Sequence, residues 1–212
     1  LDIPSSVAIM FILLLLSLTI SLVLLPFNFL PVILLYLIIT TLYSFLLKRL
    51  PIFDIITLAL LYTLRLIAGS SATGVPISEW LSGFSLFFFL SMGALKRFTE
   101  LKILLTLNKT KAKGRSYYVE DLQIIQIFGI SSGLISVLVL VLFINSTTIS
   151  NLYDNPFLLY LIIPLILYWV LRVWFLAHRG EFNEDPILFA VKDKWSYLIG
   201  LITLLIAISA TI

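Results

Sequence analysis

The chain has 212 residues, of which 61% are hydrophobic and only 12% are charged, and its formal net charge is +3. A soluble domain needs more charged residues than this to cover its surface, so the composition excludes a water-soluble fold and indicates an integral membrane protein. The absence of cysteine excludes disulfides and thiolate metal centres. The one histidine, His178, argues against a histidine-based metal site or a catalytic triad.

Apolar segments recur along the whole chain, and a membrane-spanning helix needs about 20 such residues. We therefore predict an all-α fold, a polytopic transmembrane helix bundle. Its seven predicted helices cover residues 6–25, 31–47, 53–70, 77–95, 122–145, 157–177 and 195–211. Prolines lie near most helix ends, whereas Pro164 lies inside the sixth helix and predicts a kink. The polar stretch 96–121 is too long for a simple turn and is predicted to be functional.

Positive charge gathers on one side of the predicted bundle. Counted alternately, the connections at 48–49, 96–121 and 178–194 share one side, and the connections on the other side hold no Lys or Arg. Cytoplasmic loops are enriched in these residues. We predict a plasma (inner) membrane protein with its polar, active side in the cytoplasm and its C-terminus on the outer face. Topology and anionic lipid headgroups explain the basic balance, so no nucleic-acid partner is expected.

Two charged residues lie within the third predicted helix. Asp54 and Arg65 are eleven residues apart, which places them on one face but about 16 Å apart along the axis, too far to pair directly. Charge inside a membrane is costly and often functional. Two interpretations remain open for each residue: Arg65 binds substrate or extends to the outer interface, and Asp54 is catalytic or stabilises the helix start.

A second charged group follows the fourth predicted helix. Lys96 and Glu100 are spaced i,i+4 and Arg97 and Glu100 i,i+3, so we expect the three side chains to converge on one patch. Two cations around a carboxylate at the membrane surface suit a phosphate or a metal-bound diphosphate. An ordinary salt-bridged helix end is the alternative.

The rest of the polar stretch combines cations with tyrosines. Four cations, Lys109, Lys111, Lys113 and Arg115, precede Tyr117 and Tyr118. Such a segment is predicted either to close as a lid over an anionic substrate or to lie as a solvated loop on the membrane.

Polar residues also recur every four positions in the sixth predicted helix, toward its cytoplasmic end. They are Tyr160, Tyr168 and Arg172, with Pro164 in the same register, and His178 and Arg179 follow them. We expect Arg172 to have a partner inside the bundle. His178 is predicted to donate to a phosphate or to cap the interface.

Several of these residues lie in runs that resemble the UbiA prenyltransferase superfamily, and within it the decaprenyl-phosphate phosphoribosyltransferase branch. The runs are Tyr43–Lys48, Asp54, Leu64–Gly69, Ala72–Pro76, Lys96–Leu101, Gly114–Arg115 and Tyr118. The segments His178–Glu181 and Asp185–Pro186 resemble the UbiA-like proteins that follow a phosphatase-like domain. The resemblance covers essentially residues 1–212. It implies nine helices in the full protein, two of them before Leu1, around a cavity open to the cytoplasm and the bilayer. It also implies Mg²⁺ as the cofactor, bridging a diphosphate to acidic residues.

The chain departs from this family pattern in three places. The first motif of the family, Asn-Asp-x-x-Asp, is expected upstream of Leu1, so the chain alone is expected to be inactive. Where the family has a second pair of aspartates, this chain has Lys96, Arg97 and Glu100, which leaves Glu100 as its candidate Mg²⁺ ligand. The Tyr-x-x-x-Lys pattern is longer by one residue, from Tyr43 to Lys48.

The resemblance implies transfer of a phosphoribosyl group from phosphoribosyl diphosphate to a polyprenyl phosphate. The predicted catalytic residues are Lys48, Asp54, Lys96, Arg97 and Glu100. The predicted substrate-binding residues are Tyr43, Arg65, Lys113, Arg115, Tyr118, Arg172, His178 and Arg179. Replacing Lys96 or Arg97 by Ala is expected to lower turnover and to leave membrane insertion intact.

Two alternative functions remain. The first keeps the fold but transfers a prenyl group from a polyprenyl diphosphate to an aromatic or other lipid-soluble acceptor. Its carbocation-like transition state would be stabilised by aromatic side chains such as Tyr62, Phe87, Phe88 and Phe89. The second is a non-catalytic transport or lipid-handling protein, for which charges at mid-membrane depth and broken helices are typical.

Overall fold

The structure, a computed structural model, describes residues 2–111, 114–182 and 185–211. These ranges are almost entirely helical, and the β-structure within them is limited to one bridge between Lys111 and Tyr118. The predicted fold class is confirmed: the protein is an all-α helical bundle.

The helices follow one another through short connections. The first half contains α1 (Ile3–Leu24), α2 (Phe29–Phe45), the 3₁₀ turn η1 (Leu47–Arg49), α3 (Phe53–Thr73) and α4 (Glu79–Thr106). The middle contains the 3₁₀ turn η2 (Val119–Asp121), α5 (Leu122–Ile144) and α6 (Thr147–Leu152). The last part contains the 3₁₀ segment η3 (Pro156–Leu161), α7 (Ile162–Arg179), α8 (Pro186–Lys192) and α9 (Lys194–Ala210).

Four segments of the described chain are long and apolar enough to cross a membrane. They are Pro4–Leu24, Phe53–Thr73, Val119–Ile144 and Pro156–Arg179. The helices Phe29–Phe45 and Lys194–Ala210 are shorter but also apolar. Large apolar side chains remain exposed along the bundle, for example on α1. Such a surface fits a lipid bilayer, in which it is buried by acyl chains.

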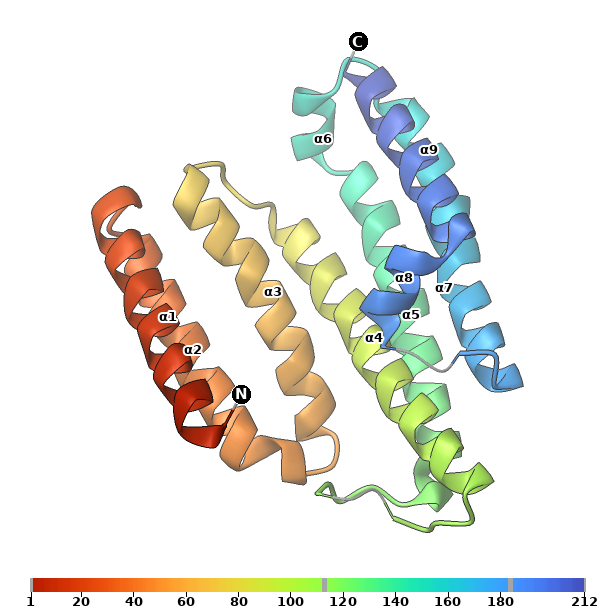
Figure 1. The fold of residues 1–212 in the computed structure, drawn as a ribbon. Coiled ribbons are helices and arrows are strands. Elements are labelled where there is room, and N and C mark those ends of the chain that lie inside the picture. Colours follow the sequence, from red (N-terminus) through yellow and green to blue (C-terminus); the bar gives the residue numbers. More distant parts are fainter. Residues whose placement is uncertain (1, 112–113, 183–184, 212) are drawn as a thin grey trace.

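Consecutive long helices run in opposite directions, so their connections alternate between two ends of the bundle (Figure 1). The α2–α3 and α4–α5 connections lie at the lower end in this view. The α1–α2, α3–α4 and α5–α7 connections lie at the upper end with the C-terminus, and they contain no Lys or Arg. The separation of charge that the sequence predicts is therefore present in the fold.

Helix α4 is the centre of the bundle and packs against α3, α5, α7 and α8. Two glycines of α5, Gly129 and Gly133, let this helix approach α4 and α7 closely. A Cβ added at Gly129 would lie 2.1 Å from the Trp174 ring and 2.8 Å from the Ala94 Cβ. A Cβ at Gly133 would lie 2.6 Å from a Val170 methyl group. Small residues of this kind permit close helix packing in membranes.

Two local predictions need correction. The polar stretch 96–121 is not a loop throughout, because α4 continues to Thr106. Its apolar side chains Phe98 and Leu101 remain buried in the core at helical spacing, which extends the helix past the charged turn. Pro164 lies in the first turn of α7 and not in a helix interior, since the preceding turn is 3₁₀. A first turn tolerates proline because its N–H groups have no intrahelical partner.

Candidate functional site

A buried ionic cluster joins α3 and α4 at the lower end of the bundle. Asp54, in the first turn of α3, is completely buried, and Arg97 of α4 is 1% exposed. The Arg97 Nε donates to Asp54 Oδ2, and its Nη2 lies 3.4 Å from Asp54 Oδ1. The Arg97 Nη1 donates to Glu100 Oε2 over 2.6 Å. Burial of this kind is tolerated because each charge has a hydrogen-bonded partner of opposite sign.

Two further predicted site residues complete the cluster. Tyr43 of α2 donates its hydroxyl to Asp54 Oδ1 over 2.8 Å and accepts from Arg97 Nη2 over 3.4 Å. Arg115, in the α4–α5 loop, donates to Glu100 Oε2. The fold thus brings together five residues from α2, α3, α4 and the α4–α5 loop. With two arginines and two carboxylates, the cluster has no net charge.

Arg97 has a structural role in this cluster, because its donor atoms are engaged by neighbouring side chains. Its Nε and both Nη atoms already donate to Asp54, Glu100 or Tyr43. An anion that displaced the Asp54 carboxylate from Arg97 would leave this carboxylate buried, with the Tyr43 hydroxyl as its remaining donor. Arg97 therefore holds α3, α4 and, through Glu100, the α4–α5 loop in place.

Lys96 lies next to Arg97 in sequence but points elsewhere, because consecutive residues of an α-helix are about 100° apart. Its Nζ pairs with Asp185 Oδ2, just before α8. The expectation that Lys96, Arg97 and Glu100 converge is therefore wrong for Lys96. The two side chains of this pair are 37% and 35% exposed. A pair so open to solvent contributes at most about 1 kcal/mol, so it can exchange partners easily.

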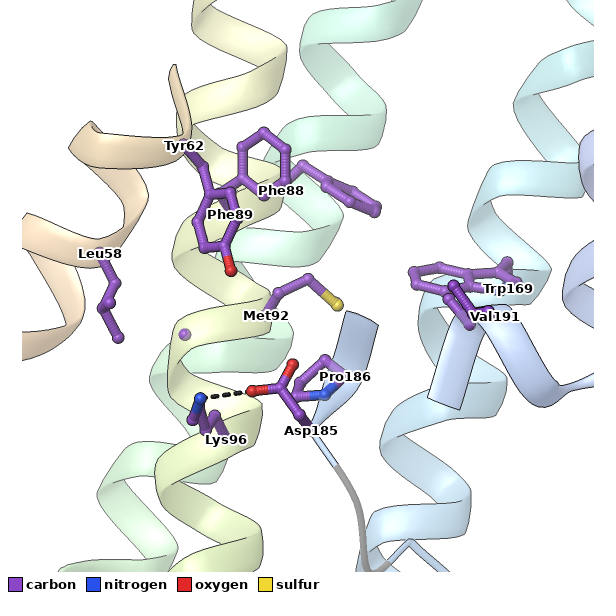
Figure 2. A pocket seen from close by; sticks show the side chains of 12 residues that line it. Leu58, Tyr62, Phe88, Phe89, Met92, Lys96, Trp169, Asp185, Pro186 and Val191 are labelled. Atoms are coloured by element: carbon purple, nitrogen blue, oxygen red, sulfur yellow. Dashed lines mark hydrogen bonds and ion pairs between the residues drawn. The ribbon is translucent and has the colours of Figure 1, made fainter. Parts of the chain in front are cut away.

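Lys96 lines one end of an apolar cavity of about 290 Å³. Its walls come from α3, α4, α7 and α8, and Figure 2 shows Lys96 and Asp185 together at one end and aromatic rings at the other. The aromatic end includes Tyr62 and Phe89, whose rings stack with centroids 4.8 Å apart. The lining residues are Leu58, Tyr62, Phe88, Phe89, Met92, Gly93, Lys96, Trp169, Asp185, Pro186, Ala190 and Val191. A cavity with one charged and one apolar end suits an amphipathic ligand.

A second ion pair holds the other end of α8. Arg172 of α7 donates from Nη1 and Nη2 to Asp193, over 2.7 and 2.9 Å. Asp193 also accepts the backbone N–H of Ser196 over 2.8 Å and so caps α9. The interior partner expected for Arg172 is present. Two aspartates, Asp185 and Asp193, therefore flank α8 and tie it to α4 and α7.

The pH dependence of Asp193 tests this second pair. Burial raises the pKa of Asp193, but hydrogen bonds from Arg172 and Ser196 outweigh it and leave the pKa below its usual value. A carboxylate with a depressed folded pKa stabilises the fold above its unfolded pKa of about 3.9, and this contribution is lost as the pH falls through the folded value. We expect Asp193→Asn to lower the unfolding midpoint at pH 6, with a difference from wild type that shrinks below pH 4. Asp154→Asn, at an exposed aspartate of the upper end, should show no such difference.

The remaining predicted site residues lie apart from the cluster. Arg65 donates to the Tyr36 hydroxyl over 2.7 and 3.1 Å and lies over the Tyr62 ring. At the end of α7, the His178 Nδ1 lies 3.1 Å from Gln126 Nε2, and Arg179 lies over Phe175.

Three predicted cation and tyrosine positions fall in or near the lower connections. Lys48 is in η1 and forms no ion pair with another described residue. Lys113 lies outside the described residues. Tyr118 is 46% exposed, and its ring lies under the ammonium group of Lys111.

Tyr117, which the sequence did not distinguish as a site residue, is the tyrosine that points inward. It is 3% exposed, and its hydroxyl accepts the backbone N–H of Ile52 over 2.8 Å. Burial raises the pKa of Tyr117 to about 12, so it remains a neutral hydrogen-bonding group. Ile52 has φ +69°, a strained conformation for a β-branched residue. Tyr117 therefore helps to hold the turn that delivers Asp54 to the cluster.

The described residues do not fit the magnesium site that the family resemblance implies. Within these ranges, no three His, Cys, Asp or Glu side chains gather closely enough to hold a metal ion. Glu100, the candidate ligand, already accepts hydrogen bonds from Arg97 and Arg115. The expected position of the main ligands upstream of Leu1 stays a prediction.

Comparison with known proteins gives two relatives. No model of a known protein family matches the chain. The chain is 37% identical over 167 residues to a Sinorhizobium fredii protein named "Uncharacterized protein y4nM", covering 78% of this chain and 32% of that protein. It is 30% identical over 142 residues to the nodulation protein NoeC of Azorhizobium caulinodans, covering 67% of this chain and 46% of that protein. The chain thus spans less than half the length of either relative, and it is similar to a part of each.

Proposed function

We propose that this chain is the membrane domain of a UbiA-type transferase that moves a phosphoribosyl group from phosphoribosyl diphosphate to a polyprenyl phosphate. The observation that carries the proposal is the apolar cavity with Lys96 at its charged end. The name of the relative NoeC states a process, nodulation, and no reaction. The proposal therefore rests on the residues of the site.

In this proposal Lys96 binds the phosphate of the lipid, and the isoprene units next to the phosphate lie in the cavity. The cavity is too small for a long chain, so the rest of the tail lies in the bilayer. The lipid phosphate is already anionic and needs no strong base. Its oxygen forms a bond to the anomeric carbon of the sugar as the bond to the diphosphate breaks, and the diphosphate leaves with the electron pair. Lys48 is proposed to neutralise the leaving group.

Arg97 takes a different role from Lys96 in this mechanism. It is a positioning residue, because its donors are engaged by Asp54, Glu100 and Tyr43. Its ion pairs fix the turn of α4 that also carries Lys96. Mg²⁺ would stabilise a leaving diphosphate, but no step assigned to the described residues depends on it.

The orientation of the bundle supports a donor from the cytoplasm. Phosphoribosyl diphosphate is water-soluble and highly charged, and the α2–α3 and α4–α5 connections, which carry Lys and Arg, lie together at the lower end of the bundle in Figure 1. Because cytoplasmic loops are enriched in Lys and Arg, the positive-inside rule supports a cytoplasmic position for this end. We therefore propose an inner-membrane protein whose site opens to the cytoplasm.

The test is a transfer assay with the complete gene product in membranes. Labelled phosphoribosyl diphosphate and polyprenyl phosphate should give a labelled lipid. Lys96→Ala should lower its formation on the order of 100-fold, as expected for loss of one preorganised charge at the site. The matched control Lys194→Ala removes an exposed lysine of α9 and should leave the rate unchanged. A Lys96→Ala variant of normal abundance and normal rate would contradict the proposal.

A second candidate function is supported by the aromatic end of the cavity. Tyr62, Phe88 and Phe89 line it, and aromatic faces stabilise a prenyl carbocation. The same membranes are therefore given labelled prenyl diphosphate with an aromatic acceptor. Label transferred from this donor, and none from phosphoribosyl diphosphate, would favour prenyl transfer. Lipid binding without transfer from either donor would favour the lipid-handling alternative.

A further inference from the structure

We propose that the carboxylate of Asp185 occupies the phosphate position of the lipid site and is displaced from Lys96 when a prenyl monophosphate binds. Asp185 would then be an internal competitor that sets the affinity of the site for its lipid. This inference rests on the proposed function in one respect only, the assignment of a lipid phosphate to Lys96.

The position of the Asp185 carboxylate in the cavity supports this inference. Asp185 and Lys96 both line the cavity, and their ion pair lies at its one charged end (Figure 2). The remaining lining residues provide almost only apolar surface. A prenyl phosphate with its tail among Tyr62, Phe88 and Met92 therefore has its phosphate where the Asp185 carboxylate now lies.

Electrostatic repulsion also favours displacement of Asp185 by a phosphate. A phosphate placed beside an intact Lys96–Asp185 pair would meet a carboxylate at close range, and two like charges there repel. The phosphate carries more negative charge than the carboxylate and gains tail burial in the same step. It can therefore replace Asp185 on Lys96, because the pair is more than one-third exposed and weak.

The ion pairs at the two ends of α8 differ in exposure and in hydrogen bonding. The Arg172–Asp193 pair has two parallel hydrogen bonds and side chains only 17% and 13% exposed. The Lys96–Asp185 pair has the more exposed side chains. Displacement of Asp185 would thus loosen the start of α8, while Arg172 keeps its end attached to α7.

The test measures binding to the purified full-length protein in nanodiscs of zwitterionic lipid, with no donor present. The probes are farnesyl phosphate, farnesol and inorganic phosphate. Asp185→Asn should bind farnesyl phosphate about two- to fivefold more tightly than wild type, the range expected for release of an exposed ion pair. Farnesol should bind equally well to both, which also shows that the cavity is intact. The matched control Asp154→Asn removes an exposed aspartate at the opposite end of the bundle and should change nothing.

The other outcomes are equally decisive. Unchanged or weaker binding of farnesyl phosphate to Asp185→Asn, with farnesol binding intact, overturns the inference. An equal gain for inorganic phosphate would show a site for soluble phosphate and would overturn its assignment to a lipid. A gain for farnesyl phosphate without transfer from any donor would uphold the inference and reject the proposed reaction. Lys96-dependent transfer without a gain in Asp185→Asn would do the reverse.

Discussion

Replacing Arg97 by Ala is expected to lower the free energy of unfolding by about 3–5 kcal/mol, the cost typical of breaking a buried ion pair. The substitution leaves Asp54 completely buried, with the Tyr43 hydroxyl as its remaining donor. It also removes one of the two cations that hold Glu100. Reversible unfolding in detergent, or the yield of folded protein from membranes, measures the loss.

The neighbouring residue gives the matched control for this prediction. Lys96→Ala removes a cation one position away in α4, but its ion pair is exposed, so its cost should stay below about 1 kcal/mol. Removing both charges with Arg97→Met and Asp54→Leu should recover part of the stability, since no charge of that pair is then left alone. An Arg97→Ala protein as stable as Lys96→Ala would contradict the structural role assigned to Arg97.

Gly129→Ala is expected to cost about 3 kcal/mol, the upper end of the usual range for overpacking, or more. The added methyl group would lie 2.1 and 2.4 Å from two ring atoms of Trp174 and 2.8 Å from the Ala94 Cβ. The ring cannot move freely, because Trp174 is 2% exposed and its Nε1 donates to Ser91 over 3.0 Å. The clash therefore forces α5 away from α4 and α7.

Gly200→Ala is the control for that substitution. Gly200 is also inside a helix, α9, and a Cβ there would meet nothing within 4 Å. Alanine favours a helix over glycine, so this variant should be as stable as wild type or slightly more stable. The two melting temperatures, measured in the same detergent, test the prediction. Similar values for the two variants would show that α5 does not pack against Trp174 as described.

Apolar length alone located the long helices. Each of the seven predicted segments coincides with a helix of the structure, because a long apolar run is a local property of the sequence. The end of α4 was missed because charged residues share that turn with Phe98 and Leu101, which remain buried. The short helices α6 and α8 were missed as well, since six or seven residues give no clear period.

The candidate site was predictable as a set of residues but not as a set of pairs. Asp54 and Arg97 are 43 residues apart in the chain. The local sequence around each residue does not predict which carboxylate pairs with which arginine. Likewise, two adjacent tyrosines in an extended segment point to opposite sides, and the sequence does not tell that Tyr117 is the buried one. Partner choice is a property of the packed helices, so it appears only with the three-dimensional structure.

The opposite directions of Lys96 and Arg97 have a consequence for natural and laboratory variation. A library of substitutions selected only for the amount of protein in the membrane should tolerate many residues at position 96 and almost none at position 97. The same library selected for lipid binding should lose its tolerance at position 96 as well. Two adjacent positions would then report on two separate properties: position 97 on the stability of the folded protein, and position 96 on its lipid binding.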